Sequence, residues 1–464
     1  MTEPQSLYQR RTPLRPRPAN GAYDRLLRLY YSFLVPPGVR VLDLGCGSGE
    51  LLAAMKPSRG VGVDTDGFLI DKARVKYPAL EFQTADQPLS AQDKFDYILL
   101  SDLVNYLPDV QSVLERLQRH SYQHTRIVLN VFNHLWRPFV AAAQKIAARS
   151  STLPENWLSA WDIENLLHLA GWEIVKTESR ILWPFKTPVF ERLFNRWLAP
   201  LLKHFCVTLF VVARPRPLPS LYRNYTCSVV IPARNEAGNI EDAVRRIPEI
   251  GMGTEIIFVE GHSKDNTWEE IQRVAAKYPD RNIKTIKQQS KGKGGAVREA
   301  FAQATGDILF ILDADLTVPP EDLIKFYNVI CTGTADFVNG VRLVYPMENQ
   351  AMRFLNMIAN KCFSIAFSWL LGQPIKDTLC GTKVLFKAQY EEIARNRSYF
   401  GDFDPFGDFD LLFGAAKLNL RMLDLPIRYR ARTYGETNIS RWRHGWLLLR
   451  MVRFAAVRLK FIKA

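Results

Sequence analysis

The feature of this chain that most constrains its fold is a short apolar run that ends at two aspartates. Ile308–Leu312 is apolar throughout, which is typical of a strand buried on both faces of a parallel sheet. Asp313 and Asp315 follow at its carboxyl end, where open α/β sheets bind their ligands. Two carboxylates one residue apart suit Mg²⁺ or Mn²⁺ bound to a diphosphate, because the cation bridges carboxylate and phosphate oxygens. A solvated acidic turn is the alternative interpretation.

Length, charge and cysteine usage limit the class of protein. A chain of 464 residues is too long for one ordinary core, so two or three domains are expected. The net charge of +14 indicates anionic partners. No nucleic-acid module is recognised, so we expect no nucleic-acid partner. Six scattered cysteines without a CxxC pair argue against zinc and favour reduced thiols in a cytosol. Neither a signal peptide nor a transmembrane helix is expected.

Two segments rich in Arg and Pro divide the chain. We expect a basic arm over 1–20 and a linker over 215–224, which separates two domains at 21–214 and 225–440. In both domains short β-like runs alternate with helical stretches, which indicates an α/β fold with parallel sheets. The remaining residues, 441–464, form a basic tail.

The first domain begins with a glycine-rich turn after a strand. Val41–Leu44 reads as a strand that includes Asp43, and Gly45, Gly47 and Gly49 lead from it into a helix. Such glycines allow a tight turn and close approach of the backbone to a ligand. A second strand ends at Asp64, which is placed to accept hydrogen bonds from ribose hydroxyls.

At these residues the chain resembles class I S-adenosylmethionine-dependent methyltransferases. The motifs are VLDLGCGSG, GVDTD, TADQP and FDYILLSDLVNYLPD, and the resemblance covers about residues 20–214. It implies a Rossmann-like domain that binds S-adenosylmethionine through Asp43, the three glycines and Asp64, with Asp86 at the adenine. Three further side chains either line an acceptor pocket or have ordinary structural roles, namely Asn105, Asn130 and His134.

The second domain resembles glycosyltransferase family 2, and specifically the polyprenyl (dolichyl) phosphate sugar transferases. Its motifs are SVVIPARNEAGNI, VEGHSKDNTWEEI, KGKGGAVREAFAQATGDILFILDADLTVPP, IKDTLCGTKVLF and YGETN, spanning about residues 225–440. The resemblance implies a GT-A fold in which the nucleotide-sugar is contacted by Pro232, Arg234, Glu236, Glu260 and Asp313. Lys293, in a basic glycine-rich turn, suits the phosphates. Asp313 and Asp315 would hold the metal. Thr317 and Thr382 depart from the family pattern, which leaves a third metal ligand and the acceptor pocket open.

The chemistry of sugar transfer needs cations near the leaving diphosphate and near an anionic acceptor. Arg342, Lys383, Arg430 and Arg432 lie in segments that match the family's acceptor and phosphate regions, although each is equally compatible with a solvated surface charge. Asp408 and Asp410 match a family acidic pair that orients the acceptor or acts as a base. Their alternative is favourable charge at a helix N-terminus.

The tail has seven cations and no acid after Ser440. Its apolar residues share one helical face, and its cations lie on the other, which is typical of a helix at a membrane interface. The apolar face consists of Leu448, Met451, Val452, Ala455, Leu459 and Ile462. Packing of this face on the domain itself is the alternative, and Met352–Leu371 is either a second membrane-facing helix or core.

The sequence thus predicts a bifunctional enzyme at the cytoplasmic face of an anionic membrane. It would join metal-dependent, inverting sugar transfer from a nucleotide-sugar to a lipid phosphate with methyl transfer from S-adenosylmethionine. In the alternative, the sugar acceptor is a sugar or protein hydroxyl and the first domain is a non-catalytic S-adenosylmethionine-binding module.

Overall fold

The computed structural model describes residues 21–138, 156–217, 224–342, 344, 354–399, 409–430, 434 and 441–462. The chain divides into two compact units, one of residues 1–216 with 460–464 and the other of residues 217–459. The chain therefore returns to the first unit at its C-terminal end. The sequence interpretation had kept residues 441–464 together as one tail, whereas the structure divides them between the units.

The first unit is built on a seven-stranded sheet in the order β3-β2-β1-β4-β5-β7-β6. Its strands are β1 (Arg40–Leu44), β2 (Arg59–Asp64), β3 (Glu81–Thr84), β4 (Phe95–Leu100), β5 (Ser121–Phe132), β6 (Trp172–Arg180) and β7 (Thr208–Pro215). Only β7 runs antiparallel to its neighbours in this sheet. The carboxyl ends of all the other strands therefore meet at one edge, which we call the ligand edge.

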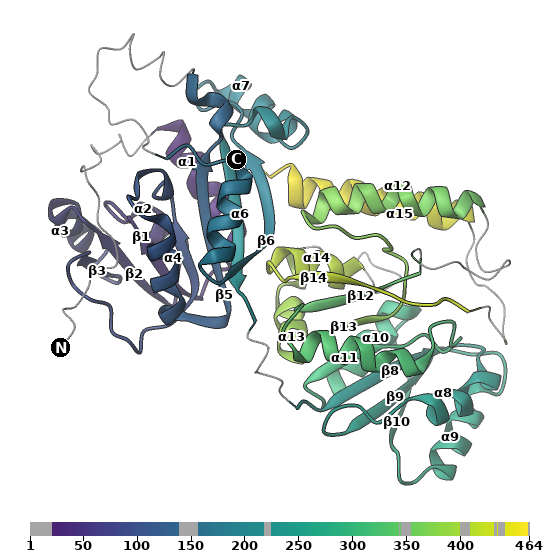
Figure 1. Ribbon diagram of the computed structural model, residues 1–464. Coiled ribbons are helices and arrows are strands. Elements are labelled where there is room, and N and C mark those ends of the chain that lie inside the picture. Colours follow the sequence, from purple (N-terminus) through teal and green to yellow (C-terminus); the bar gives the residue numbers. More distant parts are fainter. Residues whose placement is uncertain are drawn as a thin grey trace. The chain divides into compact units, whose positions relative to one another are not determined.

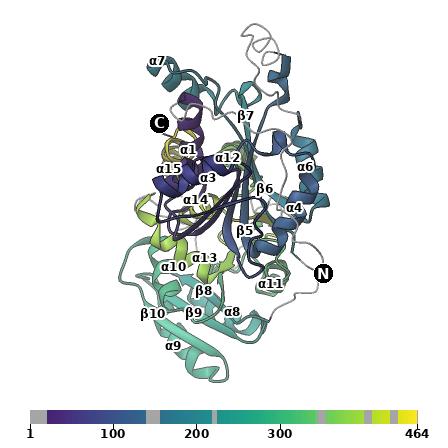
Figure 2. The same ribbon diagram turned by 90° about the vertical axis from the view of Figure 1, so that its left-hand side faces the viewer.

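Helices cover both faces of the first sheet (Figures 1 and 2). One core contains residues of α1 (Ala22–Leu34), α2 (Glu50–Ala54) and α3 (Gly67–Lys76), and the other contains residues of α4 (Val110–Leu117) and α6 (Ala160–Leu169). The α/β prediction is confirmed for this unit, because strands buried on both faces require helices on each side.

The second unit has its own seven-stranded sheet in the order β10-β9-β8-β11-β13-β12-β14. Its strands are β8 (Cys227–Ala233), β9 (Thr254–Glu260), β10 (Asn282–Lys287), β11 (Ile308–Ile311), β12 (Phe337–Val341), β13 (Lys383–Phe386) and β14 (Met422–Pro426). Only β13 is antiparallel to its neighbours in this sheet. The predicted strand at 308–312 is present and ends one residue earlier than expected.

One face of the second sheet packs on α8 (Ile240–Arg246), α9 (Thr267–Lys277) and α11 (Leu323–Cys331). The opposite face is also buried, since α10 (Gly292–Gln303) contacts β8 and β9 from that side with Val297, Ala300 and Phe301. The remaining helices are α12 (Phe354–Leu371), α13 (Lys387–Arg395), α14 (Phe409–Lys417) and α15 (Arg441–Ala455).

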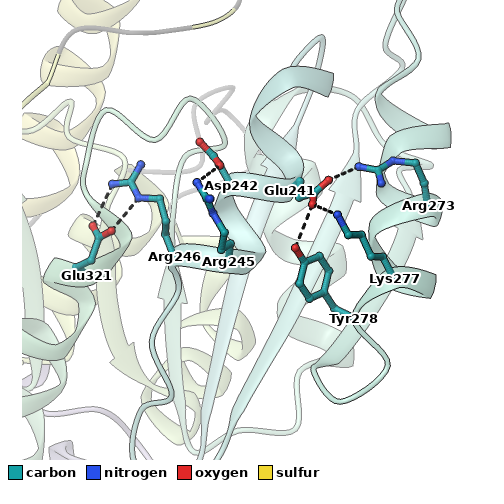
Figure 3. A network of polar contacts seen from close by, with 8 residues as sticks. All are labelled: Glu241, Asp242, Arg245, Arg246, Arg273, Lys277, Tyr278 and Glu321. Carbon is teal, nitrogen blue, oxygen red and sulfur yellow. Dashed lines mark hydrogen bonds and ion pairs between the residues drawn. The ribbon is translucent and has the colours of Figure 1, made fainter.

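A surface network of charges joins α8 to its neighbours (Figure 3). Glu241 on α8 pairs with Arg273 and Lys277 of α9, and Arg246 pairs with Glu321 at 2.8 Å. Exposed pairs of this kind contribute roughly 0–1 kcal/mol each. The Arg246–Glu321 pair also links α8 to the segment that follows the loop carrying Asp313 and Asp315.

The apolar face expected to insert into a membrane is packed inside the protein. Leu448, Met451, Ala455 and Leu459 are all buried, and α12 lies beside α15 in both views (Figures 1 and 2). The alternative of internal packing therefore describes this face. On α12, Phe367 is buried and Ile365 is 69% exposed. Within the described part of the chain, no helix combines the length and hydropathy needed to span a bilayer.

Candidate active sites

The glycine-rich turn of the first unit lies at the ligand edge, between β1 and α2. Gly45, Gly47 and Gly49 have φ of 78°, 54° and 80°, which residues with a side chain rarely adopt. The backbone N–H of Gly47 donates to Asp64 Oδ2 at 2.9 Å, and the N–H of Asp66 donates to Oδ1 at 3.0 Å. The predicted residues are therefore brought together, and the Asp64 carboxylate fixes the turn.

Asp43 is the most unusual group of this site. Its side chain is 1% exposed, and neither carboxylate oxygen has a hydrogen-bond partner among the described residues. Burial, followed by the negative charge of Asp64, raises the pKa of Asp43 to about 8. A buried carboxyl group without a partner suits a cationic ligand, and S-adenosylmethionine carries an ammonium and a sulfonium. The residues present therefore fit this cofactor.

The other residues predicted for the first unit differ in their surroundings. Asp86 follows β3 and is exposed. Asn130 is fully buried, where its amide donates to Asp102 Oδ1 at 2.5 Å and its Oδ1 accepts from Tyr31 at 2.8 Å. Asn105 Nδ2 donates to the carbonyl of Asn156 at 2.8 Å. The structural roles weighed for both asparagines therefore describe them, and His134 is exposed.

In the second unit, the carboxyl ends of β8 and β9 hold the residues predicted for the nucleoside. Pro232 lies in β8, and Arg234 follows it with an exposed side chain. Glu236 is buried and accepts from Asn239 Nδ2 at 2.7 Å. Glu260 ends β9, where it accepts from the N–H of Ser263 at 2.5 Å. The two buried carboxylates thus order the loops that follow β8 and β9.

Asp313 lies two residues after the end of β11 and forms an ion pair with Lys293. The Lys293 ammonium is 2.6 Å from Asp313 Oδ1. Burial alone would raise the pKa of Asp313, but the positive charges of Lys293, Lys383 and Arg342 hold it below its usual value. A Cβ on Gly381 would lie 2.0 Å from Asp313 Oδ2. Only glycine at that position leaves room for the carboxylate and its partner.

Asp315 is oriented by Thr317. The Thr317 hydroxyl donates to Asp315 Oδ1 at 2.8 Å, and its N–H donates to the same oxygen at 3.2 Å. The backbone N–H of Arg430 donates to the Thr317 carbonyl at 3.0 Å, while the Arg430 side chain is exposed. No group of three His, Cys, Asp or Glu side chains able to hold a metal occurs in the ranges that the structure describes. Asp313 and Asp315 would therefore share a cation with phosphate oxygens.

Arg342 and Lys383 are not solvated surface charges. Arg342 donates from Nε and Nη2 to the two oxygens of Asp377, at 2.7 and 2.9 Å. Burial lowers the pKa of Arg342, but Asp377 outweighs it, so the pKa lies above its usual value. Lys383 is fully buried and donates to the carbonyl of Cys380 at 2.5 Å. Both cations act on Asp313 from within the protein.

Asp410 lies at the start of α14, nearly buried, with Arg397 Nε 2.8 Å from its Oδ2. Its predicted neighbour Asp408 and the predicted cation Arg432 lie outside the described residues. Sequence reasoning missed Gln288, whose side-chain amide donates to the carbonyl of Gly292 at 2.7 Å and so holds the glycine-rich turn. It also missed Asp377 and Gly381, although both belong to the recognised motif IKDTLCGTKVLF.

Comparison with known families identifies the kind of domain in each half of the chain. Residues 228–397 match the model of glycosyl transferase family 2, and residues 8–177 match that of a methyltransferase domain. The chain joins a methyltransferase domain to a glycosyltransferase family 2 domain. Both resemblances inferred from the motifs are confirmed.

Individual relatives match only parts of this enzyme. Dolichol-phosphate mannosyltransferase of Pyrococcus furiosus is 30% identical over 218 residues, which are 46% of this chain and 59% of that protein. Dolichyl-phosphate beta-glucosyltransferase of Dictyostelium discoideum is 28% identical over 235 residues, 47% of this chain and 69% of that protein. A solved S-adenosylmethionine dependent methyltransferase from Mesorhizobium loti has 21% identity, covering 42% of this chain and 98% of that one, with a TM-score of 0.33. A TM-score that low supports no functional comparison.

Proposed function

We propose that residues 225–440 transfer a sugar from a nucleotide-sugar to a lipid (polyprenyl) phosphate, and that residues 21–214 transfer a methyl group from S-adenosylmethionine. The observation that carries the sugar-transfer proposal is the ion pair of Lys293 with Asp313 in the loop after β11, two residues before Asp315. The names of the Pyrococcus and Dictyostelium relatives support a lipid-phosphate acceptor.

The residues of the second unit fit a single displacement. An oxygen of the acceptor phosphate forms a bond to the anomeric carbon, and the bond from that carbon to the diphosphate breaks with its electron pair on the leaving oxygen. Attack opposite the leaving group inverts the carbon. A bound Mg²⁺ or Mn²⁺ would neutralise charge on the leaving diphosphate, and Asp313 and Asp315 would hold it. Lys293 would then donate to the diphosphate in place of Asp313.

The environment of Asp410 favours the phosphate acceptor over a hydroxyl acceptor. A hydroxyl needs a base that takes its proton, whereas a phosphate is already an anion. Asp410 is buried, and its Oδ2 already accepts a hydrogen bond from Arg397 Nε at 2.8 Å. We assign it a positioning role, in which it holds α14 against the segment that carries Arg397. Arg342 and Lys383 supply the positive potential for two anionic substrates.

For the first unit we propose S-adenosylmethionine bound by the turn at Gly45–Gly49, by Asp64 and Asp86, and by the Asp43 carboxylate. The bound cofactor supplies the electrophilic methyl group. The chain's own residues align it with a nucleophile, the main contribution such a site makes. A non-catalytic binding module remains the competing hypothesis; binding without methyl transfer would support it.

Attachment to the cytoplasmic face of an anionic membrane follows from a lipid acceptor. The outer face of α15 suits such a surface, because Trp446 and Leu449 are 66% and 52% exposed beside the exposed cations Arg450 and Arg453. Each cation near an anionic surface contributes on the order of 1 kcal/mol.

The decisive experiment measures sugar transfer to a polyprenyl phosphate with Asp315→Asn. This change keeps the shape of the side chain but removes the charge needed by a metal ligand. Turnover should fall by about 100-fold or more, with loss of metal-dependent nucleotide binding. Asp280→Asn, at an exposed acid away from the site, is the matched control and should retain activity. If the Asp315→Asn variant keeps full turnover both after chelator treatment and with added metal, the proposal is refuted.

A further inference from the structure

The connection between β6 and β7 contains a helix with its apolar side turned outward. It runs through α7 (Pro188–Glu191) and the π-helical turn η4 (Arg192–Leu198). The outward stripe, spaced by four, is Val189, Leu193, Trp197 and Leu201, which are 77%, 46%, 42% and 62% exposed. The inward stripe, also spaced by four, is Glu191, Asn195 and Ala199, which are 5%, 3% and 0% exposed. A surface helix normally has the reverse arrangement.

The inward polar residues hold the helix in this orientation. Asn195 Oδ1 accepts from the N–H groups of Leu182 and Trp183, both at 2.8 Å, and its amide donates to the Trp183 carbonyl at 2.7 Å. Buried Glu191 forms an ion pair with Arg25 of α1. Rotating the helix to bury its apolar stripe would break these bonds and expose their partners. The outward stripe is therefore a fixed feature of the fold.

Further apolar side chains widen this surface. Phe185, Phe190, Leu202 and Phe205 are 61%, 54%, 40% and 64% exposed. Together with the outward stripe they form what we call the apolar-out surface. Four cations lie among them, namely Lys186, Arg192, Arg196 and Lys203. The one acid between Ile181 and Val207 is Glu191, whose charge is buried and paired. A surface this apolar needs a partner, and its charge is purely positive.

The apolar-out surface lies at the ligand edge of the first sheet. Thr208 at the start of β7 pairs with Arg180 at the end of β6 and with Phe132 at the end of β5. The chain between them therefore leaves and rejoins the sheet at the edge that holds the S-adenosylmethionine turn, and Figure 1 shows α7 beyond the ends of these strands. The amide of Asn133, which follows β5, donates to the carbonyls of His204 and Cys206, both at 3.0 Å.

We propose that the apolar-out surface docks on an anionic lipid bilayer, so that the methyltransferase unit receives a methyl acceptor carried by the membrane. Apolar and aromatic side chains enter the acyl boundary, while Lys and Arg around them pair with anionic headgroups. A bilayer matches both properties of the surface, since it offers an apolar interior beneath negative charge. This inference does not rest on sugar transfer or on the outer face of α15.

The test uses the full chain and vesicles of phosphatidylcholine with or without phosphatidylglycerol. Leu193→Glu with Leu201→Glu places two negative charges in the outward stripe. Val75→Glu with Met252→Glu, at positions 85% and 71% exposed elsewhere, is the matched control. Vesicle flotation of the outward-stripe variant should fall by about tenfold or more, and that of the control should not change. In the parent, anionic vesicles should slow hydrogen exchange over residues 185–205.

Charge and partner identity are tested separately. Lys186→Glu with Lys203→Glu should weaken the preference for anionic over neutral vesicles, because the remaining cations of the chain, such as Arg450 and Arg453, are unchanged. Unchanged flotation of the outward-stripe variant, or unchanged exchange over 185–205, would overturn the proposal. So would a parent dimer that the outward-stripe substitutions convert to a monomer, because a second copy would then be the partner. Sugar transfer to a detergent-solubilised lipid phosphate should persist in every variant, which separates this inference from the proposed function.

Discussion

The titration of Asp43 gives the sharpest test of the cofactor site. With a pKa of about 8 in the folded protein and about 3.9 in an unfolded chain, the folded state binds the extra proton between these values. Stability of the first unit should therefore fall as pH rises from about 4 to 8, by about 1.4 kcal/mol per pH unit. At pH 7 the free energy of unfolding of the first unit should therefore be about 4 kcal/mol lower than at pH 4.

Asp43→Asn removes this titration while keeping the shape of the side chain. Relative to the parent, the variant should gain about 1.4 kcal/mol of stability per pH unit and reach a plateau above pH 8. Hydrogen exchange of the β1 and β2 peptides as a function of pH measures this difference within the first unit. Parallel curves for the two proteins would show that Asp43 is not a protonated buried acid.

Binding of S-adenosylmethionine should be coupled to the loss of the Asp43 proton. A cationic ligand favours ionised Asp43, so at pH 7 binding should release about 0.9 proton, and affinity should rise about 50-fold from pH 6 to pH 8. Calorimetry in buffers of different ionisation enthalpy counts the proton. Asp43→Asn should bind more weakly and release none. Equal affinity and equal proton release in the two proteins would refute the assignment of Asp43 to the cofactor.

Three further substitutions probe packing and charge. Gly381→Ala should abolish metal-dependent nucleotide binding in calorimetry while leaving S-adenosylmethionine binding intact, because its Cβ would displace the Asp313 carboxylate. Glu178→Gln should destabilise the first unit by about 3–5 kcal/mol in chemical denaturation, since the buried cations Arg180 and Lys460 lose their common carboxylate. Arg342→Ala should destabilise the second unit by a similar amount, whereas a solvated arginine would cost almost nothing.

The strands that carry the sites could be predicted from the sequence because each is a short apolar run followed at once by polar residues. β1 begins one residue before the expected strand at Val41–Leu44, and β11 ends one residue early. Parallel strands are buried on both faces, so their apolar runs are continuous and their ends are distinct. The glycines of the first turn were equally predictable, because residues with a side chain rarely adopt backbone angles of this kind.

Long-range partners could not be predicted in the same way. Arg342 and Lys293 looked like phosphate ligands, and nothing in their local sequence names Asp377 or Asp313 as the partner. Pairing depends on the register of strands far apart in the chain. Glu178 and Lys460 are 282 residues apart.

The helical segment Pro188–Leu198, with the turn after it, could not be oriented correctly from the sequence. Two stripes of equal spacing occur there, one apolar and one containing Glu191 and Asn195. Hydrophobic patterning predicts that the apolar stripe is buried. The structure reverses this, because buried Glu191 pairs with Arg25 of α1 and buried Asn195 bonds to backbone groups of Leu182 and Trp183. A pattern of residue types along one helix cannot predict partners that lie elsewhere in the chain.

The departure from the family pattern at Thr317 has a consequence for metal binding. Its short hydroxyl donates to Asp315 and fixes the carboxylate. A cation held by Asp313 and Asp315 alone must take most of its ligands from phosphate oxygens and water. Under the proposed function, the metal and the nucleotide-sugar would therefore complete each other's site. Binding free energies are reciprocal, so each should raise the affinity of the other by the same factor.

Calorimetric titration of metal with and without nucleotide, and of nucleotide with and without metal, measures the two factors. Tight binding of metal in the absence of nucleotide would show that the protein supplies further ligands.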